Sequence, residues 1–313
     1  MVEFYKTIDG RVTELSGFTE GCWVNMVHPS SDELEEIARV ARVEEEFIRA
    51  ALDPEESSRV ETEDDQLLMI VDIPMVEKSS VEDGGQMFST LPMGIVVGQN
   101  AVITVCLDDS IILRSIAEGA VKGVHTAMRT RFVFQILLRV AGRFLKNLRM
   151  IERDFTRIEK RLYDSLKNEE LIQLLGLSKS LVYFSASLKG NEVTMEKVLR
   201  GRVLKLYEDD RDILEDALIE IRQAIEMAGI YSSILSGTMD AYASVVSNNL
   251  NIIMKVLTVL TIIMTIPNII FGFYGMNIEG GRIPGDFVWW IPLAISVGGC
   301  FFAWFMLKKK NLD

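Results

Sequence analysis

The sequence predicts an α/β domain at the N-terminal end, followed by a long helix and two membrane-spanning helices near the C-terminus. Short apolar strands alternate with helical segments over 1–125, the pattern of an α/β domain. Helical periodicity dominates from 130 onward. Two uncharged, mostly apolar stretches, 256–274 and 287–307, can each cross a hydrocarbon core of roughly 30 Å at about 1.5 Å rise per residue.

Residues 1–125 are expected to form a mixed sheet covered by helices. The dipeptide Asp9-Gly10 suits a hairpin turn. Ser30 or Ser31 suits the start of a helix, because a hydroxyl can accept a hydrogen bond from the first turn. Further helices are expected at 44–52 and 110–117. The expected strands are 2–6, 11–15, 22–27, 59–63, 67–73, 87–97 and 101–106.

The region 126–202 is expected to be a helical hairpin region. Apolar residues recur at spacings of three and four over 132–164, which predicts an amphipathic helix. Two shorter helices are expected at 168–187 and 192–199, with a break at Gly190-Asn191.

The chain from 203 contains no proline until Pro267, which predicts one helix of roughly 100 Å. A soluble domain of this size needs no helix of that length, so we expect it to carry a membrane span. The expected C-terminal divisions are a stalk at 203–250, a first span at 251–274, an outer loop at 275–286, a second span at 287–307 and a basic tail at 308–313.

Charge predicts the topology. Lys308, Lys309 and Lys310 directly follow the second span, and basic residues beside a span favour the cytoplasmic side. Two spans then place both termini in the cytoplasm and make the protein a multi-pass protein of the cell membrane. The N-terminal segment carries charges where a signal peptide would have its apolar core, so we expect no cleavage.

Composition excludes several functions. The net charge of −12 argues against nucleic acid as a partner and is compatible with divalent cations. Cys22, Cys106 and Cys300 are far apart and form no metal-binding pattern, so they are interpreted as reduced, buried thiols. His28 and His125 lack a second ligand at metal-binding spacing. No nucleotide-binding or hydrolase motif is present, and an enzyme is not expected.

Polar residues in the first span follow a heptad pattern. Four of them, Asn251, Thr258, Thr265 and Gly272, are seven apart, and Met254, Thr261, Asn268 and Gly275 repeat the spacing with an offset of three. Together they form one stripe along a helix. Two interpretations stay open: small and hydroxyl residues pack membrane helices together, or the stripe is the wall of a pore shared by several copies.

An acidic cluster opens the long helix, from Glu208 to Asp216. Such a cluster is usually solvated. In a bundle of identical copies it would also be able to bind cations between subunits.

The sequence Tyr274-Gly275-Met276-Asn277, at the end of one apolar span and before a short loop and a last span, resembles the CorA family of magnesium channels. The segments 247–251 and 254–258 look like that family's pore entrance, and the basic C-terminal end also matches. The architecture is similar over the whole length, and the likeness is most specific at 247–277.

The resemblance implies a homopentamer in the lipid bilayer whose first span lines a central pore for Mg²⁺. It assigns ion recognition to Gly275, Met276 and Asn277, and pore-facing rings to Asn251, Met254 and Leu257, whereas the heptad stripe selects Thr258 instead of Leu257. It also implies sensing of cytosolic Mg²⁺ by carboxylates between neighbouring domains. Asp216 stands at the expected stalk position. The partner helix has Ala50-Ala51 there, with Asp53 as the nearest acid, so this sequence departs from the family pattern.

The chemistry of the stripe suits a hydrated cation. Mg²⁺ gives up its waters reluctantly, and a wall of Asn and Thr can hydrogen-bond to those waters without replacing them. The alternatives are a related transporter of zinc, cobalt or nickel, which the absence of His and Cys from the pore disfavours, and a membrane-anchored sensor or scaffold that conducts nothing.

Overall fold

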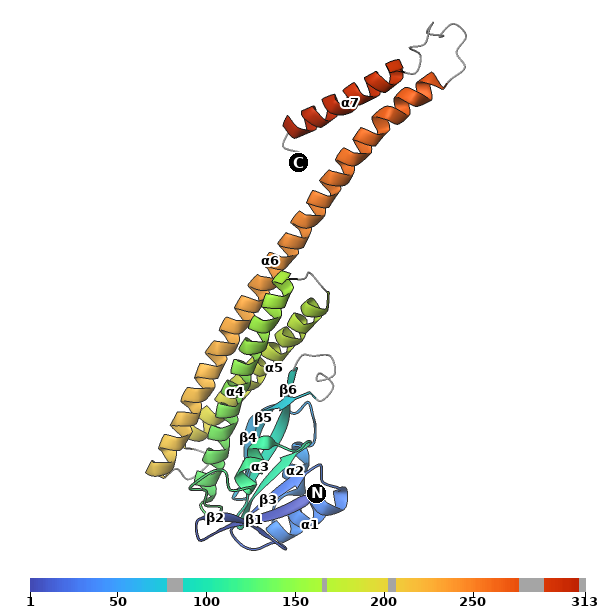
Figure 1. Ribbon diagram of the computed structural model, residues 1–313. Helices are drawn as coiled ribbons and strands as arrows, with labels where there is room; N and C mark the ends of the chain where they lie inside the picture. The colour runs from blue at the N-terminus through green and yellow to red at the C-terminus, as the bar shows by residue number, and fades with distance from the viewer. Residues whose placement is uncertain (78–86, 165–167, 202–206, 276–289, 310–313) are drawn as a thin grey trace. The chain divides into compact units, whose positions relative to one another are not determined.

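The computed structural model describes residues 1–77, 87–164, 168–201, 207–275 and 290–309. The chain divides into two compact units, Met1–Ser236 and Gly237–Asp313. The first unit contains the sheet and the start of the long helix, and the second contains the rest of that helix and the last helix (Figure 1).

One mixed sheet forms the centre of the first unit, as the alternation of strands and helices predicts. Only the contact between the strands at 22–27 and 101–106 is parallel, and all other neighbours in the sheet are antiparallel. The strands are β1 (Val2–Ile8), β2 (Arg11–Leu15), β3 (Cys22–Val27), β4 (Arg59–Glu63), β5 (Gln66–Val76), β6 (Phe88–Val97) and β7 (Ala101–Cys106), in the order β2-β1-β3-β7-β6-β5-β4.

The hairpin at Asp9-Gly10 is confirmed. Both residues have positive φ, +50° and +78°, and Ile8 pairs with Arg11 across the turn. Positive φ at both central residues gives a turn whose twist matches that of the strands.

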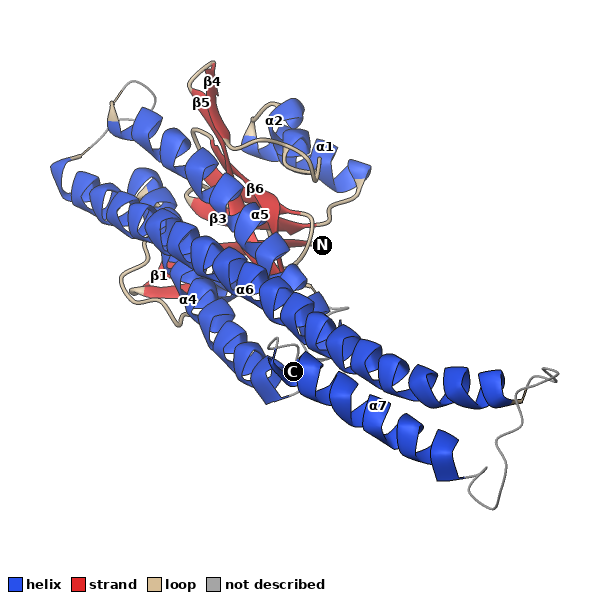
Figure 2. Ribbon diagram, turned by 90° about the horizontal axis from the view of Figure 1, so that it is seen from above, coloured by secondary structure: helices blue, strands red, loops and turns tan. Residues whose placement is uncertain are grey.

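Helices cover both faces of the sheet (Figure 2). On one face α1 (Ser31–Ala41) and α2 (Glu45–Ala50) pack on a cluster that includes Cys22, Val24 and Met26. Trp23, which lies between Cys22 and Val24 along β3, points to the other face and contacts the ring of Phe132 with centroids 5.4 Å apart. Because successive strand residues alternate between faces, β3 is buried on both sides.

Ser30 begins α1 through a capping box. Its hydroxyl accepts a hydrogen bond from the Glu33 backbone at 3.3 Å, and the Glu33 carboxylate accepts one from the Ser30 backbone at 2.8 Å. The sequence left Ser30 and Ser31 as alternatives, and Ser30 is the cap. The short helix α3 (Ile111–Ala117) follows β7.

The second face is covered by α4 (Arg129–Asp164) and α5 (Asn168–Leu199). The expected break at Gly190-Asn191 is wrong, because α5 is continuous through both residues. Asn191 does not disrupt the helix because its amide is used by the sheet: it accepts a hydrogen bond from the Asp72 backbone N–H and donates one to the Asp72 carbonyl, both at 2.8 Å. Gly190 lies so close to Ser58 that an added Cβ would be 3.2 Å from its side chain.

The long helix is α6 (Glu208–Tyr274), which contains Pro267. Its first part joins the other helices of the first unit through ion pairs: Arg222 contacts Glu192 at 2.8 Å and Glu196 at 2.6 Å on α5. The last described helix is α7 (Trp290–Lys309) in the second unit.

Candidate functional site

The polar stripe occupies an exposed face of α6 in the second unit. All the stripe residues predicted to line a pore are exposed in the single chain, and Met254 and Leu257 both expose 54% of their surface. Both Leu257 and Thr258 are therefore exposed on this helix, so the single chain does not choose between them. The exposed pore-lining candidates are Asn251, Met254, Leu257, Thr258, Thr261, Thr265, Asn268 and Gly272.

Within the second unit, α7 packs on the other side of α6. The thiol of Cys300 lies 3.4 Å from the carbonyl oxygen of Ile263, and an added Cβ at Gly299 would be 3.0 Å from the side chain of Ile266. At 3.6 residues per turn, Ile263 lies on the helix face opposite to Thr261 and Thr265, and Ile266 lies at the flank of that opposite face. The second helix therefore leaves the stripe uncovered.

The threonines of the stripe donate their hydroxyl protons to their own helix. Thr258 donates to the Met254 carbonyl at 2.7 Å, Thr261 to the Leu257 carbonyl at 2.8 Å and Thr265 to the Thr261 carbonyl at 2.7 Å. Because each proton is occupied, the oxygen lone pairs remain as acceptors. Acceptors suit the water shell of a cation, whose water molecules point their hydrogens outward.

The predicted selectivity residues fall at the end of this helix. Gly275 is exposed, and its backbone N–H donates to the Phe271 carbonyl at 2.9 Å, which closes the last turn. Met276 and Asn277 lie outside the described residues, as does the predicted loop up to 286.

Among the described helices, three are long and apolar enough to cross a membrane: α5, α6 and α7. The sequence predicted two. The apolar window of α5 is 44% buried inside the chain, compared with 0% for α6 and 11% for α7. Part of the apolar surface of α5 packs on the sheet and on α4, where Phe184 contacts Phe144 with ring centroids 5.1 Å apart.

The two carboxylates predicted to regulate the protein are exposed and belong to different sides of the sheet. Asp53 follows α2, and its Oδ1 accepts a hydrogen bond from the Glu55 backbone at 2.9 Å. Asp216 lies on α6, which is joined to α4 and α5 beyond the opposite face (Figure 2). A single ion cannot therefore touch both within one chain, and a shared ion would have to lie between two copies.

The environment of Ala51 explains why a carboxylate is absent there. Ala51 is fully buried, and an added Cβ at Gly94 of β6 would be 2.5 Å from the Cβ of Ala51. A carboxylate at a fully buried position would lose its hydration, which is costly. Asp53 is the nearest acid along the chain and is exposed. On α6, burial raises the pKa of Glu220, and the charge of Asp216 one turn earlier raises it further.

The described residues contain no group of three or more His, Cys, Asp and Glu that would hold a metal ion. The described cysteines are free; Cys22 and Cys106 are buried as predicted, whereas Cys300 is only partly buried. His28 follows β3 directly and adopts a positive φ of 45°.

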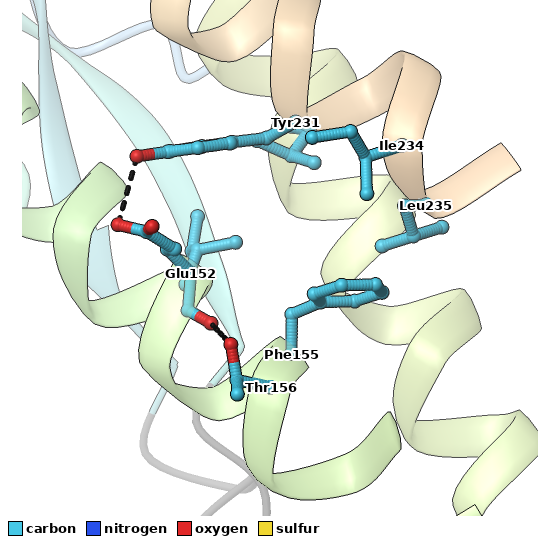
Figure 3. A pocket seen from close by; sticks show the side chains of 8 residues that line it. Glu152, Phe155, Thr156, Tyr231, Ile234 and Leu235 are labelled. Carbon is cyan, nitrogen blue, oxygen red and sulfur yellow. Dashed lines mark hydrogen bonds between the residues drawn. The ribbon is translucent and has the colours of Figure 1, made fainter. Parts of the chain in front are cut away.

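A cavity of about 190 Å³ lies between α4, α5 and α6 in the first unit (Figure 3). The hydroxyl of Tyr231 donates to Glu152 Oε2 at 2.9 Å, and the Thr156 hydroxyl donates to the Glu152 carbonyl at 3.0 Å. The remaining lining is apolar, with Phe155 and Leu235 facing the space. The polar groups that line the cavity hydrogen-bond to one another, so we interpret the cavity as packing space between three helices.

Sequence reasoning missed the contact of Cys300 with Ile263. The available signal was Pro267, because a proline in a helix frees the carbonyl four residues earlier and creates a need for another donor.

Known proteins that are similar to this chain were identified by sequence and by structure. A curated relative, the cobalt/magnesium transport protein CorA of Methanocaldococcus jannaschii, is 27% identical over 287 residues, which cover 88% of this chain and 86% of the relative. The cobalt/magnesium transport protein CorA of Thermotoga maritima is 33% identical over 136 residues, 39% of this chain and 37% of that protein.

The fold matches a solved structure over the whole chain. The complete structure of the CorA magnesium transporter from M. jannaschii aligns with a TM-score of 0.84 at 22% identity, covering 100% of this chain and 99% of that one. The sequence profile described as "CorA-like Mg2+ transporter protein" matches residues 19–309. The match spans both units and the whole candidate site, and the chain therefore belongs to the CorA-like Mg²⁺ transporter family.

Proposed function

We propose that this protein is a magnesium channel of the cell membrane that works as a homopentamer, with α6 lining a central pore. Membership of the CorA-like family supports the transport of Mg²⁺, and the curated relatives are named for cobalt as well as magnesium. In this proposal Mg²⁺ is the transported substrate.

The observation that carries the proposal is the exposed polar stripe on the face of α6 opposite to α7. Such a stripe is unfavourable against lipid, because polar groups in hydrocarbon need partners. Since α7 packs on the other face, the stripe needs water or further copies of the same helix. A ring of identical copies around a water-filled pore meets both needs.

Ion selection in this pore follows from hydrogen bonds to a hydrated cation. Rings of Thr258, Thr261 and Thr265 present acceptor oxygens, and rings of Asn251 and Asn268 add amide oxygens. At the outer mouth Gly275, Met276 and Asn277 form the selectivity site. Rings of Met254 and Leu257 are apolar constrictions that gate by dewetting.

The proposed topology has two spans. The α6 and α7 windows are hardly buried inside the chain, as expected for helices surrounded by lipid or by other copies, whereas α5 is partly used in the core of the first unit. The lysines from 308 onward favour the cytoplasmic side, so both termini lie in the cytoplasm.

Regulation by cytosolic Mg²⁺ completes the proposal. Asp216 of one copy and Asp53 of the next share a cation between subunits, since the two residues are separated within one chain. The cation relieves the repulsion of the carboxylates and favours a closed, compact state.

The test is ion flux into liposomes that contain the purified protein, with Mg²⁺, Co²⁺, Ni²⁺ and Zn²⁺ compared. Thr261→Val/Thr265→Val keeps the side-chain shape but removes two rings of acceptors. We expect Mg²⁺ flux to fall on the order of tenfold, which corresponds to about 1.4 kcal/mol. Ile262→Val, between the two threonines in sequence but off the stripe, is the control. Parental flux in the threonine variant would remove the stripe from the pore, and absence of flux in the parent would favour a sensor or scaffold.

A further inference from the structure

The carbonyl of Ile263 lacks its ordinary donor. In an α-helix this oxygen would accept a hydrogen bond from the backbone N–H of residue 267, but that residue is proline and has no N–H. The position lies in the middle of the predicted first span, where water is absent and an unpaired carbonyl costs several kcal/mol. Another donor is therefore needed.

The thiol of Cys300 supplies one. Its Sγ is 3.4 Å from the Ile263 oxygen, and Cys300 is partly buried in the contact between α6 and α7. A thiol is a weak donor in water, but in hydrocarbon no solvent competes for the carbonyl.

One further feature holds this contact in place. Gly299 brings the helices close together, because an added Cβ would be 3.0 Å from the Ile266 side chain. Next to it is an open cavity of about 390 Å³, lined by Ile263 and Pro267 from α6 and by residues of α7 that include Phe301 and Trp304. The space beside the proline allows the helix to bend differently if the thiol is lost.

We propose that Cys300 is a positioning residue for ion conduction. Its thiol closes the hydrogen bond that Pro267 opens, and so sets the direction in which α6 continues after the proline. The outer stripe residues Asn268 and Gly272 follow that bend, and the contact acts on them from the face opposite to the stripe, without touching the ion. This role rests on the proposed magnesium channel, whereas the hydrogen bond itself does not.

Infrared spectroscopy of the full-length protein in liposomes tests the bond. Subtracting the spectrum of Cys300→Ala isolates the S–H stretching band of Cys300 from those of Cys22 and Cys106. We expect this band at a lower frequency than that of an alkanethiol in hexane. In Pro267→Ala the backbone N–H returns, Ile263 regains its own donor, and the Cys300 band should move to the free-thiol position. A free-thiol band in the parent, or a band that does not respond to Pro267→Ala, overturns the proposal.

Mg²⁺ flux in the same liposomes tests the positioning role. Cys300→Ala should raise the half-saturating Mg²⁺ concentration several-fold, and Cys300→Ser, which keeps a donor, should restore it. Ser296→Ala alters the lining of the same cavity without removing the thiol and should behave like the parent. An unchanged half-saturating concentration in Cys300→Ala overturns the positioning role. A parent that carries no Mg²⁺ contradicts the channel and this role together, while the infrared band still decides the bond.

Discussion

The side-chain amide of Asn191 pairs with the backbone of Asp72 as a neighbouring strand would. It contacts both the N–H and the carbonyl of Asp72 at 2.8 Å, and its Oδ1 also accepts a hydrogen bond from the Ser58 hydroxyl at 3.0 Å. Asp72 needs these partners because β4 does not extend alongside it: the first residue of β4, Arg59, pairs with Ile70 of β5. Asp72 lies beyond that point, and Asn191 of α5 supplies the partners for its partly buried backbone N–H and carbonyl.

We predict that Asn191→Ala destabilises the first unit by about 2 kcal/mol, because two backbone groups of Asp72 lose their partners in a partly buried site. Urea unfolding of the full-length protein in detergent measures the change. Lys189→Ala, on the exposed side of the same helix, is the control. Equal midpoints for Asn191→Ala and the parent would show that water replaces the amide at no cost.

Asp72 itself predicts a dependence of stability on pH. Burial raises the pKa of its carboxyl group, and the neighbouring polar side chains of Ser187 and Ser58 oppose this in part. A pKa above the unfolded value of about 3.9 means that stability is present in full below that pH and is lost as the pH rises through the folded pKa. Asp72→Asn removes the charge, so we expect it to be more stable than the parent at pH 7 and to lose this advantage at pH 3.

Melting temperatures of Asp72→Asn and the parent between pH 3 and pH 7 check this expectation. The exposed Glu63→Gln removes a charge elsewhere and should run parallel to the parent. A constant difference between Asp72→Asn and the parent across this range would contradict the assignment to the Asp72 carboxyl.

Asn277→Ala should reduce Mg²⁺ uptake on the order of tenfold or more and leave assembly intact. The proposed ring of five amide oxygens at the pore mouth would be lost, whereas a residue of the predicted outer loop contributes little to folding. Uptake by cells that depend on this protein for Mg²⁺ measures the effect, and size-exclusion chromatography measures assembly. Asn311→Ala, in the basic tail, is the control. Transport at the parental rate would refute the selectivity role.

Cysteine labelling tests the proposed topology. In a variant without Cys22, Cys106 and Cys300, a cysteine at Glu279 should react with a membrane-impermeant maleimide added to intact cells. A cysteine at Lys309 should react only after permeabilisation, since basic flanks stay in the cytoplasm. The reverse labelling would overturn the topology, and labelling of both from outside would rule out two spans.

Asp216→Lys should partly replace regulatory Mg²⁺ by a fixed positive charge. We expect the parent to become more susceptible to protease at low Mg²⁺, because repulsion between the carboxylates then loosens the subunits, and the variant to keep its resistance. Limited proteolysis of the full-length protein with and without Mg²⁺ measures this. Digestion rates that ignore Mg²⁺ in both proteins would identify the acidic cluster as merely solvated.

Much of this protein follows from its sequence alone. The Asp9-Gly10 hairpin, the strands and the long helix depend on local backbone preferences and on periodicity, which neighbouring residues set. The stripe from Asn251 to Gly272 is of the same kind, because a helix converts a heptad spacing directly into one face. The family resemblance rests on Gly275, Met276 and Asn277 in their place after the first span, and the match over 19–309 confirms the family.

Contacts between distant segments were decided by the tertiary structure. Gly190-Asn191 looks like a helix break in the sequence, yet α5 continues through it. The Asn191 amide instead hydrogen-bonds to the Asp72 backbone, which β4 does not reach. Ala51 is buried against Gly94 of β6, and α7 packs on the side of α6 on which the Cys300 thiol contacts the carbonyl freed by Pro267. The physical reason is common to these cases: a sequence pattern assigns residues to a face, but which partner meets that face depends on how elements far apart in the chain pack together.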